Sequence, residues 1–224
     1  RPLGVGAGGL AVLAAIESEE REAIIERVAP ALPAFGKLTD AGLRLACEET
    51  ARAGVAVIQN RVSLGVTAVG AHFCDSMGQA MGAVSVAALT QRMTAARVRR
   101  IAQQVRAAAA QIEQRIRTRA LVTQGALAVF AEHGFLGSSI EQILVRAGVS
   151  RSAFYSQFDG KLAVVCAIAE DFEPEWTPLF DVLADLHDPD MESLTAWAAI
   201  FLDFHRNNLE TCTLLTQVTA LEEK

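Results

Sequence analysis

The sequence predicts an α+β fold, in which a mixed α/β unit comes first and an all-helical region follows. The composition is that of a globular chain, since 51% of the 224 residues are hydrophobic and 21% are charged. Short segments rich in Val and Ala, separated by turn residues, lie within the first 92 residues and indicate strands. From Thr94 onward the apolar residues recur with the period of a helix. The length suits one or two domains.

Helices and strands alternate in the predicted α/β unit. A helix is expected over residues 10–16, and Ser18, followed by two glutamates, is expected to cap a second helix that runs to about residue 28. Thr39 is expected to cap a third helix, which ends at Gly54. Strands are expected over residues 55–58, 67–73 and 83–89, the last two joined as a hairpin.

A long helical segment follows from Thr94 to His133. Its apolar face recurs every three or four residues between Val98 and Ile116, and a second apolar stripe ends at Gly134. As one helix at 1.5 Å per residue, the segment would be about 60 Å long. That is long for a globular protein, so we expect a break or a domain junction near residues 116–119.

Two short capped helices follow, joined by a tight turn. Ser139 with Gln142 three residues later forms a capping box. Gly148 suits the left-handed turn position, and Ser150 caps the next helix, over residues 151–158. This pattern is typical of a helix-turn-helix, whose second helix enters the major groove of DNA. The alternative is a small helical hairpin with a solvated polar face.

The second helix is expected to turn Phe154 and Phe158 inward and its polar residues outward. An arginine there can pair with guanine or phosphate, a glutamine with adenine, and a small serine allows close backbone approach. Tyrosine, lysine and a helix start with its serine suit phosphate contacts. The predicted DNA-binding residues are Ser139, Ser150, Arg151, Ser152, Tyr155, Gln157 and Lys161.

The aromatic pair, the turn and the closing lysine occur within residues 126–135, 138–140 and 147–155, with Phe158 and Lys161 after them. This arrangement resembles the DNA-binding region of the TetR (tetracycline-repressor-like) family over about residues 117–168. The resemblance implies a three-helix unit with residues 151–157 as its recognition helix. It also implies that the start of a helical ligand-binding and dimerisation domain follows.

The first part of the chain carries a second resemblance, in residues 1–3, 6–14, 54–56, 65–66 and 83–86. These residues resemble the later half of the IclR-type effector-binding domain, over about residues 1–116. By that resemblance the effector-binding residues would be Gly8, Gly9, Leu10, Leu13, His72 and Ser85. The imidazole of His72 could pair with an acidic metabolite, but a core or edge histidine is the alternative. The Ser85 hydroxyl could equally bind a backbone carbonyl.

The net charge of −6 is unevenly distributed along the chain. Residues 97–161 carry nine Arg and one Lys against four acidic residues, a local charge of +6, so the remainder carries −12. A basic block inside an acidic chain favours one segment that contacts phosphate.

Several other classes of site are not expected. The spacing Gly4-x-Gly6-x-x-Gly9 matches a dinucleotide fingerprint, but a preceding strand is missing, so we expect no nucleotide cofactor. No arrangement of residues supports catalysis, and we expect neither an enzyme nor a metal site. The acidic residues around 181–190 are predicted to form a solvated loop. The four scattered cysteines indicate reduced core thiols and a cytoplasmic protein.

The sequence therefore predicts a homodimeric DNA-binding transcriptional regulator, a ligand-responsive repressor of a palindromic operator on double-stranded DNA. The domains expected are a partial effector-binding domain over 1–116, a helix-turn-helix domain over 117–164, and the start of a helical regulatory domain over 165–224. The alternatives are an IclR-type small-molecule sensor fragment and a joined fragment of two regulators without an intact sensor.

Overall fold

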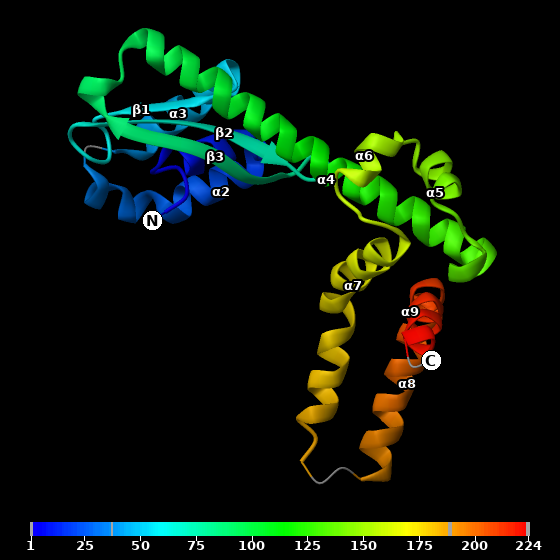
Figure 1. Cartoon of the computed structure of the whole chain (residues 1–224). Coiled ribbons are helices and arrows are strands. Elements are labelled where there is room, and N and C mark those ends of the chain that lie inside the picture. The colour runs from blue at the N-terminus through cyan, green and yellow to red at the C-terminus, as the bar shows by residue number, and fades with distance from the viewer. Residues whose placement is uncertain (1, 37, 188–189, 223–224) are drawn as a thin grey trace. The chain divides into compact units, whose positions relative to one another are not determined.

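Figure 1 shows the computed structural model of the chain, which describes residues 2–36, 38–187 and 190–222. The chain divides into two compact units, Arg1–Arg117 and Thr118–Lys224. Each unit has its own hydrophobic core and is described by itself below.

The first unit combines helices with a three-stranded antiparallel sheet of order β1-β2-β3, which confirms the predicted α+β class and the hairpin. Its strands are β1 (Ala56–Gln59), β2 (Val66–Cys74) and β3 (Ala80–Leu89). Its helices are α1 (Ala7–Ala15), α2 (Ser18–Val28), η1 (Ala29–Phe35), α3 (Asp40–Ala53), η2 (Thr90–Arg92) and the first part of α4 (Ala95–Gly137).

Helices cover both faces of this sheet (Figure 1). On one face, Ala56 and Ile58 of β1 join the core that α1 and α3 form. On the other face, Val69 and Ala71 of β2 pack against α4. The approach of α1 to the sheet is very close, because a methyl group at Gly70 would lie 2.8 Å from the carbonyl of Ala7.

Of the two helix caps predicted in this unit, one is confirmed and one is wrong. The hydroxyl of Thr39 accepts a hydrogen bond from the Gly42 amide at 3.1 Å, and Gly54 ends α3 with a φ of 66°, as predicted. The predicted cap at Ser18 is wrong, since Glu17 holds the cap position of α2 and makes no side-chain capping bond. Ser18 is already the first helical residue, next to Glu19 and Glu20, which favour the positive end of the helix dipole.

Helix α4 is continuous through residues 116–119, so the break expected there is not found. The two compact units nevertheless divide between Arg117 and Thr118. Along this one helix, Ala102 and Val105 reach the core of the first unit, and Val122 and Ala126 reach that of the second. The one non-helical φ/ψ pair recorded within α4 is at Gly134, where φ is 68°.

The second unit is helical and is completed by α5 (Ile140–Ala147), α6 (Arg151–Tyr155), α7 (Lys161–Ala184), α8 (Met191–Asn207) and α9 (Leu209–Glu222). Its core joins Val122 and Phe130 of α4 to residues of α5, α6, α7 and α9. Phe154 and Phe158 are 0% and 3% exposed, with ring centroids 5.6 Å apart, which confirms their predicted inward orientation.

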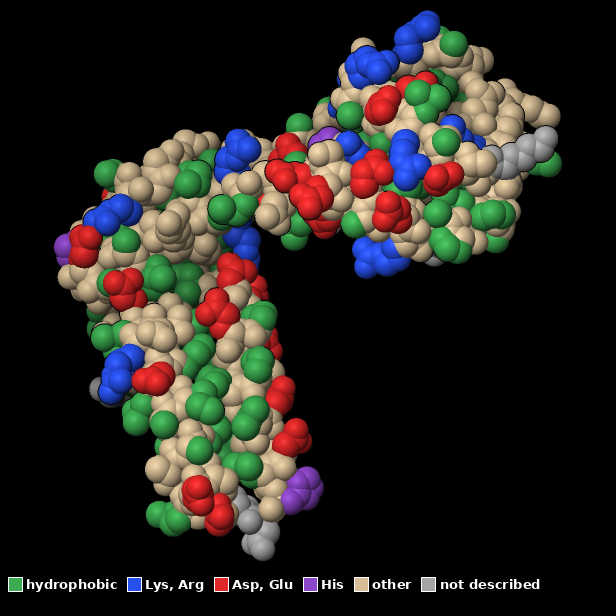
Figure 2. Space-filling model, turned by 180° about the vertical axis from the view of Figure 1, so that it is seen from behind, with side chains coloured by type: hydrophobic (Ala, Val, Ile, Leu, Met, Phe, Trp, Pro, Cys, Tyr) green, Lys and Arg blue, Asp and Glu red, His purple; other side chains and the backbone are tan. Residues whose placement is uncertain are grey.

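Aromatic side chains join α7 to α8. Phe172 stacks on Phe204 with centroids 5.4 Å apart, and the Trp197 indole donates a hydrogen bond to the carbonyl of Leu179 at 2.8 Å. Figure 2 shows hydrophobic side chains gathered along these two helices. The acidic loop predicted over 181–190 is shorter than expected, because Asp181 lies within α7, and Asp190 caps α8 by accepting a hydrogen bond from the Ser193 amide at 2.8 Å. Asp188 lies outside the described residues.

Candidate nucleic-acid interface and effector face

The turn between α5 and α6 is built as its sequence predicts. The Ser139 hydroxyl accepts a hydrogen bond from the Gln142 amide at 3.3 Å, and the Gln142 side chain accepts one from the Ser139 amide at 2.7 Å, which completes the capping box. Gly148 ends α5 in the left-handed conformation, with a φ of 65°, which a side chain would strain. The Ser150 hydroxyl then accepts a hydrogen bond from the Ala153 amide at 3.2 Å and caps α6.

Burial of Phe154 determines which face of α6 reaches solvent. Arg151, Ser152 and Tyr155 are all exposed, whereas Phe154 between them is fully buried. Helix α6 is shorter than the predicted 151–158, because it ends at Tyr155. Gln157 therefore lies just beyond the helix and is half-buried. Of the predicted DNA-binding residues, the structure thus brings Ser150, Arg151, Ser152 and Tyr155 together on α6 and its cap, and it leaves Gln157 beyond the helix.

The arginine of this surface, Arg151, already forms an ion pair within the protein. The guanidinium of Arg151 forms an ion pair with the carboxylate of Glu141 on α5. A hydrogen bond from its own backbone amide, and next the one from Arg151, hold the pKa of Glu141 below its usual value. Both side chains are about 60% exposed, at 61% and 62%, so the pair is weak and DNA phosphate can compete for Arg151.

Lys161, which is predicted to clamp a phosphate, makes its observed contacts within the protein. Its ammonium donates hydrogen bonds to the carbonyls of Phe135 and Ser138, both at 2.6 Å, and to the Ser138 hydroxyl at 3.3 Å. It also lies 4.8 Å from the centre of the Phe135 ring. These contacts hold the segment between α4 and α5 against the start of α7, because Ser138 is buried and its carbonyl requires a donor.

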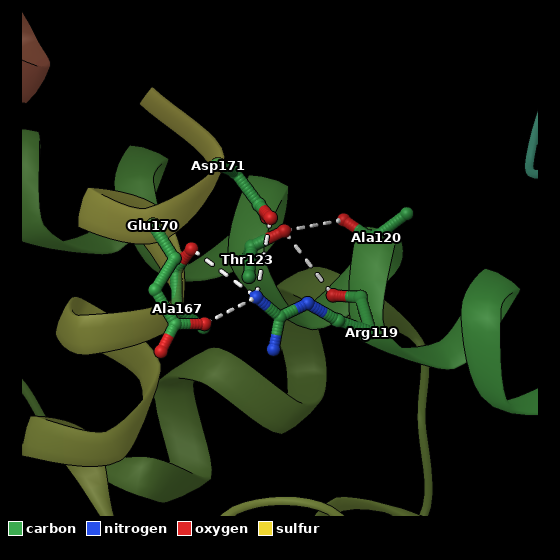
Figure 3. Close-up of polar contacts among 6 residues, drawn as sticks. All are labelled: Arg119, Ala120, Thr123, Ala167, Glu170 and Asp171. Atoms are coloured by element: carbon green, nitrogen blue, oxygen red, sulfur yellow. Dashed lines mark hydrogen bonds and ion pairs between the residues drawn. The ribbon is translucent and has the colours of Figure 1, made fainter. Parts of the chain in front are cut away.

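A polar cluster around Arg119 was not predicted (Figure 3). The Arg119 guanidinium donates to the carboxylates of Glu170 and Asp171, both at 3.1 Å, and to the carbonyl of Ala167 at 3.4 Å. The Thr123 hydroxyl donates to the carbonyls of Arg119 and Ala120 one turn before it. The cluster joins α4 to α7 within the second unit, and no local sequence pattern could reveal it, since about fifty residues separate the partners.

The predicted effector residues divide into two groups. Gly8, His72 and Ser85 are brought together where α1 begins on one face of the sheet, since Ser85 pairs with Gly70 and His72 with Ala83. A methyl group at Gly8 would lie 3.4 Å from the Ser85 hydroxyl oxygen, so the space between the helix start and β3 is about the size of one methyl group.

The remaining effector residues pack against the protein itself. Leu10 and Leu13 are 2% and 0% exposed and belong to the hydrophobic core, so in this conformation they line no open pocket. A methyl group at Gly9 would lie 3.1 Å from the Gly4 amide nitrogen. Every residue of α1 is small or apolar, and in this structure Leu10 and Leu13 pack into the core, so their contact with an effector stays a prediction.

The aromatic residues of α7 and α8 line an open groove instead. Its volume is about 330 Å³, and Phe172, Trp176, Phe180, Phe201 and Phe204 form most of its apolar wall. Two of these residues, Trp176 and Phe180 on α7, are each more than 40% exposed.

The four cysteines differ in burial. Cys47 is buried, and this burial raises the pKa of its thiol to about 11, as expected for a reduced core thiol. Cys166 is exposed, so the predicted core location is wrong for it.

Among the described residues, no helix has both the length and the apolar character needed to cross a membrane. Within the same residues, no three side chains that could bind a metal ion lie close together.

The chain thus joins an α+β fold to a helical region that contains a helix-turn-helix. The family model described as the bacterial transcriptional regulator IclR C-terminal domain matches residues 1–114, and the chain belongs to this family. The model of the bacterial regulatory proteins of the tetR family matches residues 122–168. Both predicted resemblances are thereby confirmed.

Solved structures of IclR regulators are similar to the first half of the chain. A transcriptional regulator from a Silicibacter species is 30% identical, covering 52% of this chain and 46% of that one, with a TM-score of 0.46. The IclR protein of Thermotoga maritima is 20% identical, covering 51% and 47%, with a TM-score of 0.48. The C-terminal domain of E. coli KdgR is 20% identical, covering 50% and 70%, with a TM-score of 0.46. The chain spans about half the length of the first two, and no curated protein sequence matches it.

Proposed function

We propose that this chain is a DNA-binding transcriptional regulator that reads duplex DNA through the start of α6. The observation that carries the proposal is the turn at Gly148, which joins two capped helices and leaves Arg151, Ser152 and Tyr155 exposed above the buried Phe154. A recognition helix needs this arrangement, because its N-terminal residues contact base edges while its other face packs on the protein.

The side chains at this surface have separate proposed roles. Arg151 donates to a guanine edge or to phosphate, and Gln157 pairs with adenine. Tyr155 and the start of α5 at Ser139 contact phosphates, which fixes the register of the protein on DNA. Ser152 and the Ser150 cap allow the backbone of α6 to approach the groove.

The partners and the regulation are part of the same proposal. The chain acts as a homodimer on a palindromic operator in the cytoplasm, as a repressor that a small acidic metabolite controls. The metabolite binds where Gly8, His72 and Ser85 meet, in a state in which α1 has moved away from β3. The domain boundaries proposed are 1–116 for sensing, 117–164 for DNA binding and 165–224 for the start of the helical regulatory domain.

A salt titration with a 30-base-pair duplex tests the DNA-binding proposal. The logarithm of the association constant should fall linearly with the logarithm of salt concentration, by about 0.9 for each phosphate contacted. On an operator selected from a random duplex library, Arg151→Gln should weaken binding by about 5- to 150-fold, which corresponds to 1–3 kcal/mol.

Arg206→Gln is the matched control, because this arginine is 78% exposed on α8, away from α6. It should bind the operator as the unmodified chain does. Absent binding, binding independent of salt, or an equal effect of the two variants would contradict the proposal.

A further inference from the structure

The basic charge of the chain lies mostly outside the helix-turn-helix. Residues 97–117 carry six arginines and one glutamate, a net charge of +5, whereas residues 118–161 carry only +1. No Asp or Glu occurs from Ser76 to Ile112. The proposed reading helix therefore does not account for the basic block, which belongs to the first unit.

The arginines at the start of α4 are exposed and lack acidic partners. Arg97, Arg99 and Arg100 make no ion pair with any carboxylate among the residues that the structure describes. Arg106 differs, because it donates a hydrogen bond to the carbonyl of Ala53 at 3.3 Å. Unpaired guanidinium groups on a rigid helix are available to a ligand of opposite charge.

Two of these arginines share one flank of the helix. At about 100° per residue, Arg97 and Arg100 are about 60° apart around the axis, whereas Arg99 is at least about 100° from either. Arg97 and Arg100, with Thr94 and Gln104, line an open cavity of about 610 Å³. We call this surface the α4 basic groove.

We propose that the α4 basic groove binds the phosphate backbone of duplex DNA, as a second contact that is independent of α6. This inference goes beyond the proposed function, because it assigns DNA contact to the first unit. Guanidinium groups match phosphate geometry with two parallel hydrogen bonds, and the side-chain amide of Gln104 adds a neutral donor. Arg97 and Arg100 are about 4.5 Å apart along the helix axis, which is comparable with the 3.4 Å rise per phosphate of one DNA strand.

A membrane surface is a poorer match for the same arginines. Binding of a helix in a lipid interface requires that its apolar face enter the acyl boundary. The apolar face of α4 is already covered, since Ala102 and Val105 are 6% and 2% exposed and pack with the sheet. The groove therefore offers charge and hydrogen-bond donors without a free apolar face, and this combination suits a polyanion in water.

The test is the salt dependence of binding to a 30-base-pair duplex of arbitrary sequence, measured by fluorescence anisotropy with the full chain. In the variant with both Arg97→Gln and Arg100→Gln, the salt slope should become shallower by about 1.8, since each lost phosphate contact removes about 0.9. Arg99→Gln is the matched control, because it removes the same charge from the other flank of the same helix. Its slope should stay at that of the unmodified chain.

Chemical protection gives a second readout. Phenylglyoxal modifies exposed arginines, and mass spectrometry locates the modified residues. DNA should protect Arg97 and Arg100 but leave Arg99 reactive. Circular dichroism of each variant confirms that the fold is retained.

Three outcomes would overturn the inference. In the first, the double variant keeps the full salt slope. In the second, Arg99→Gln lowers the slope by as much per lost charge as the double variant does, which would show a general charge effect. The third is retention on phosphatidylglycerol vesicles that depends on Arg97 and Arg100, with an unchanged DNA slope, which would assign the groove to lipid. Arg151→Gln separates this inference from the proposed function, because loss of the α6 contact leaves the effect of the double variant unchanged.

Discussion

At the residue scale, Arg151 of the proposed DNA surface is paired with Glu141 before DNA binds. Both side chains are exposed, and an exposed ion pair contributes at most about 1 kcal/mol. DNA must therefore displace a weak internal partner before it can bind Arg151. Glu141 also places a negative charge beside the surface that phosphate approaches.

Glu141→Gln should strengthen DNA binding by about two- to five-fold. The substitution releases Arg151 and removes a carboxylate that repels phosphate, and 1 kcal/mol corresponds to about a five-fold change. Fluorescence anisotropy on the selected operator measures the effect. Asp181→Asn, an exposed carboxylate on α7, is the control for net charge. Equal gains in the two variants would show that the pair with Arg151 is irrelevant.

Lys161 is a residue for which the structure shows contacts that the sequence did not predict. Its position at the end of the helix-turn-helix suggests a phosphate clamp, but three hydrogen bonds within the protein engage its ammonium. The sequence could not reveal this, because the acceptors are carbonyl groups of the segment that precedes α5. Carbonyls are present at every residue and leave no signature in the sequence.

Lys161→Met should lower the free energy of unfolding of the second unit by about 2–3 kcal/mol. The reason is that the variant leaves the carbonyls of Phe135 and Ser138 without their charged donor. Urea unfolding followed by circular dichroism measures the change, and Arg206→Met, at a highly exposed side chain, should change stability by less than about 0.5 kcal/mol. If Lys161→Met instead reduces only the salt slope of DNA binding, the phosphate-clamp role is correct.

At the element scale, three of the four predicted helix caps are confirmed, and the cap predicted at Ser18 is wrong. Thr39, Ser139 and Ser150 accept the predicted amide hydrogen bonds, because the donor lies three residues away in each case. The predictions fail where packing at a distance decides. Helix α4 continues past residue 116, and two separate cores bury residues of its successive parts, which periodicity alone cannot show.

Contacts between elements were the least predictable part of the candidate site. The effector residues Leu10 and Leu13 carry the same apolar pattern whether they face a ligand or a core, and the structure places them in the core. Likewise Arg119 is one of many arginines in the sequence, and only the fold brings Glu170 and Asp171 beside it (Figure 3).

Arg119→Met should weaken the attachment of α7 to α4. The variant loses two partly exposed ion pairs and a hydrogen bond to the Ala167 carbonyl, for which we expect a cost of about 1 kcal/mol. Hydrogen exchange should become faster in the first turns of α7, where the partners lie. Arg115→Met, on an exposed residue of the same helix, is the control. Indistinguishable exchange in the two variants would show that the cluster does not hold α7.

At the scale of the whole molecule, the distribution of charge matters more than its sum. The net charge of −6 suggests a chain that avoids DNA, yet it combines a basic groove on α4 with an acidic helical region. The helix-turn-helix itself is nearly neutral, because Glu132, Glu141 and Asp159 offset most of its basic residues. Its proposed contacts with DNA therefore depend on where each side chain lies and less on an overall positive field.

The two compact units have separate cores, and we expect them to unfold in two separable transitions. Ile25 and Ile143 are each 0% exposed, the first in the core of α1–α3 and the second in the helical core. The same substitution to Val at either site removes one buried methyl group, which costs about 0.5–1.5 kcal/mol. In a domain of about 100 residues, 1 kcal/mol shifts the melting temperature by about 4–8 °C.

Ile25→Val should therefore shift one calorimetric transition and Ile143→Val the other, each leaving its counterpart in place. Each variant is the control for the other, because both remove the same methyl group and only the core that loses it differs. Hydrogen exchange assigns each transition to its unit, with β2 reporting on the first and α5 on the second. A single transition that both variants shift equally would mean that α4, which contributes to both cores, makes the chain one cooperative unit.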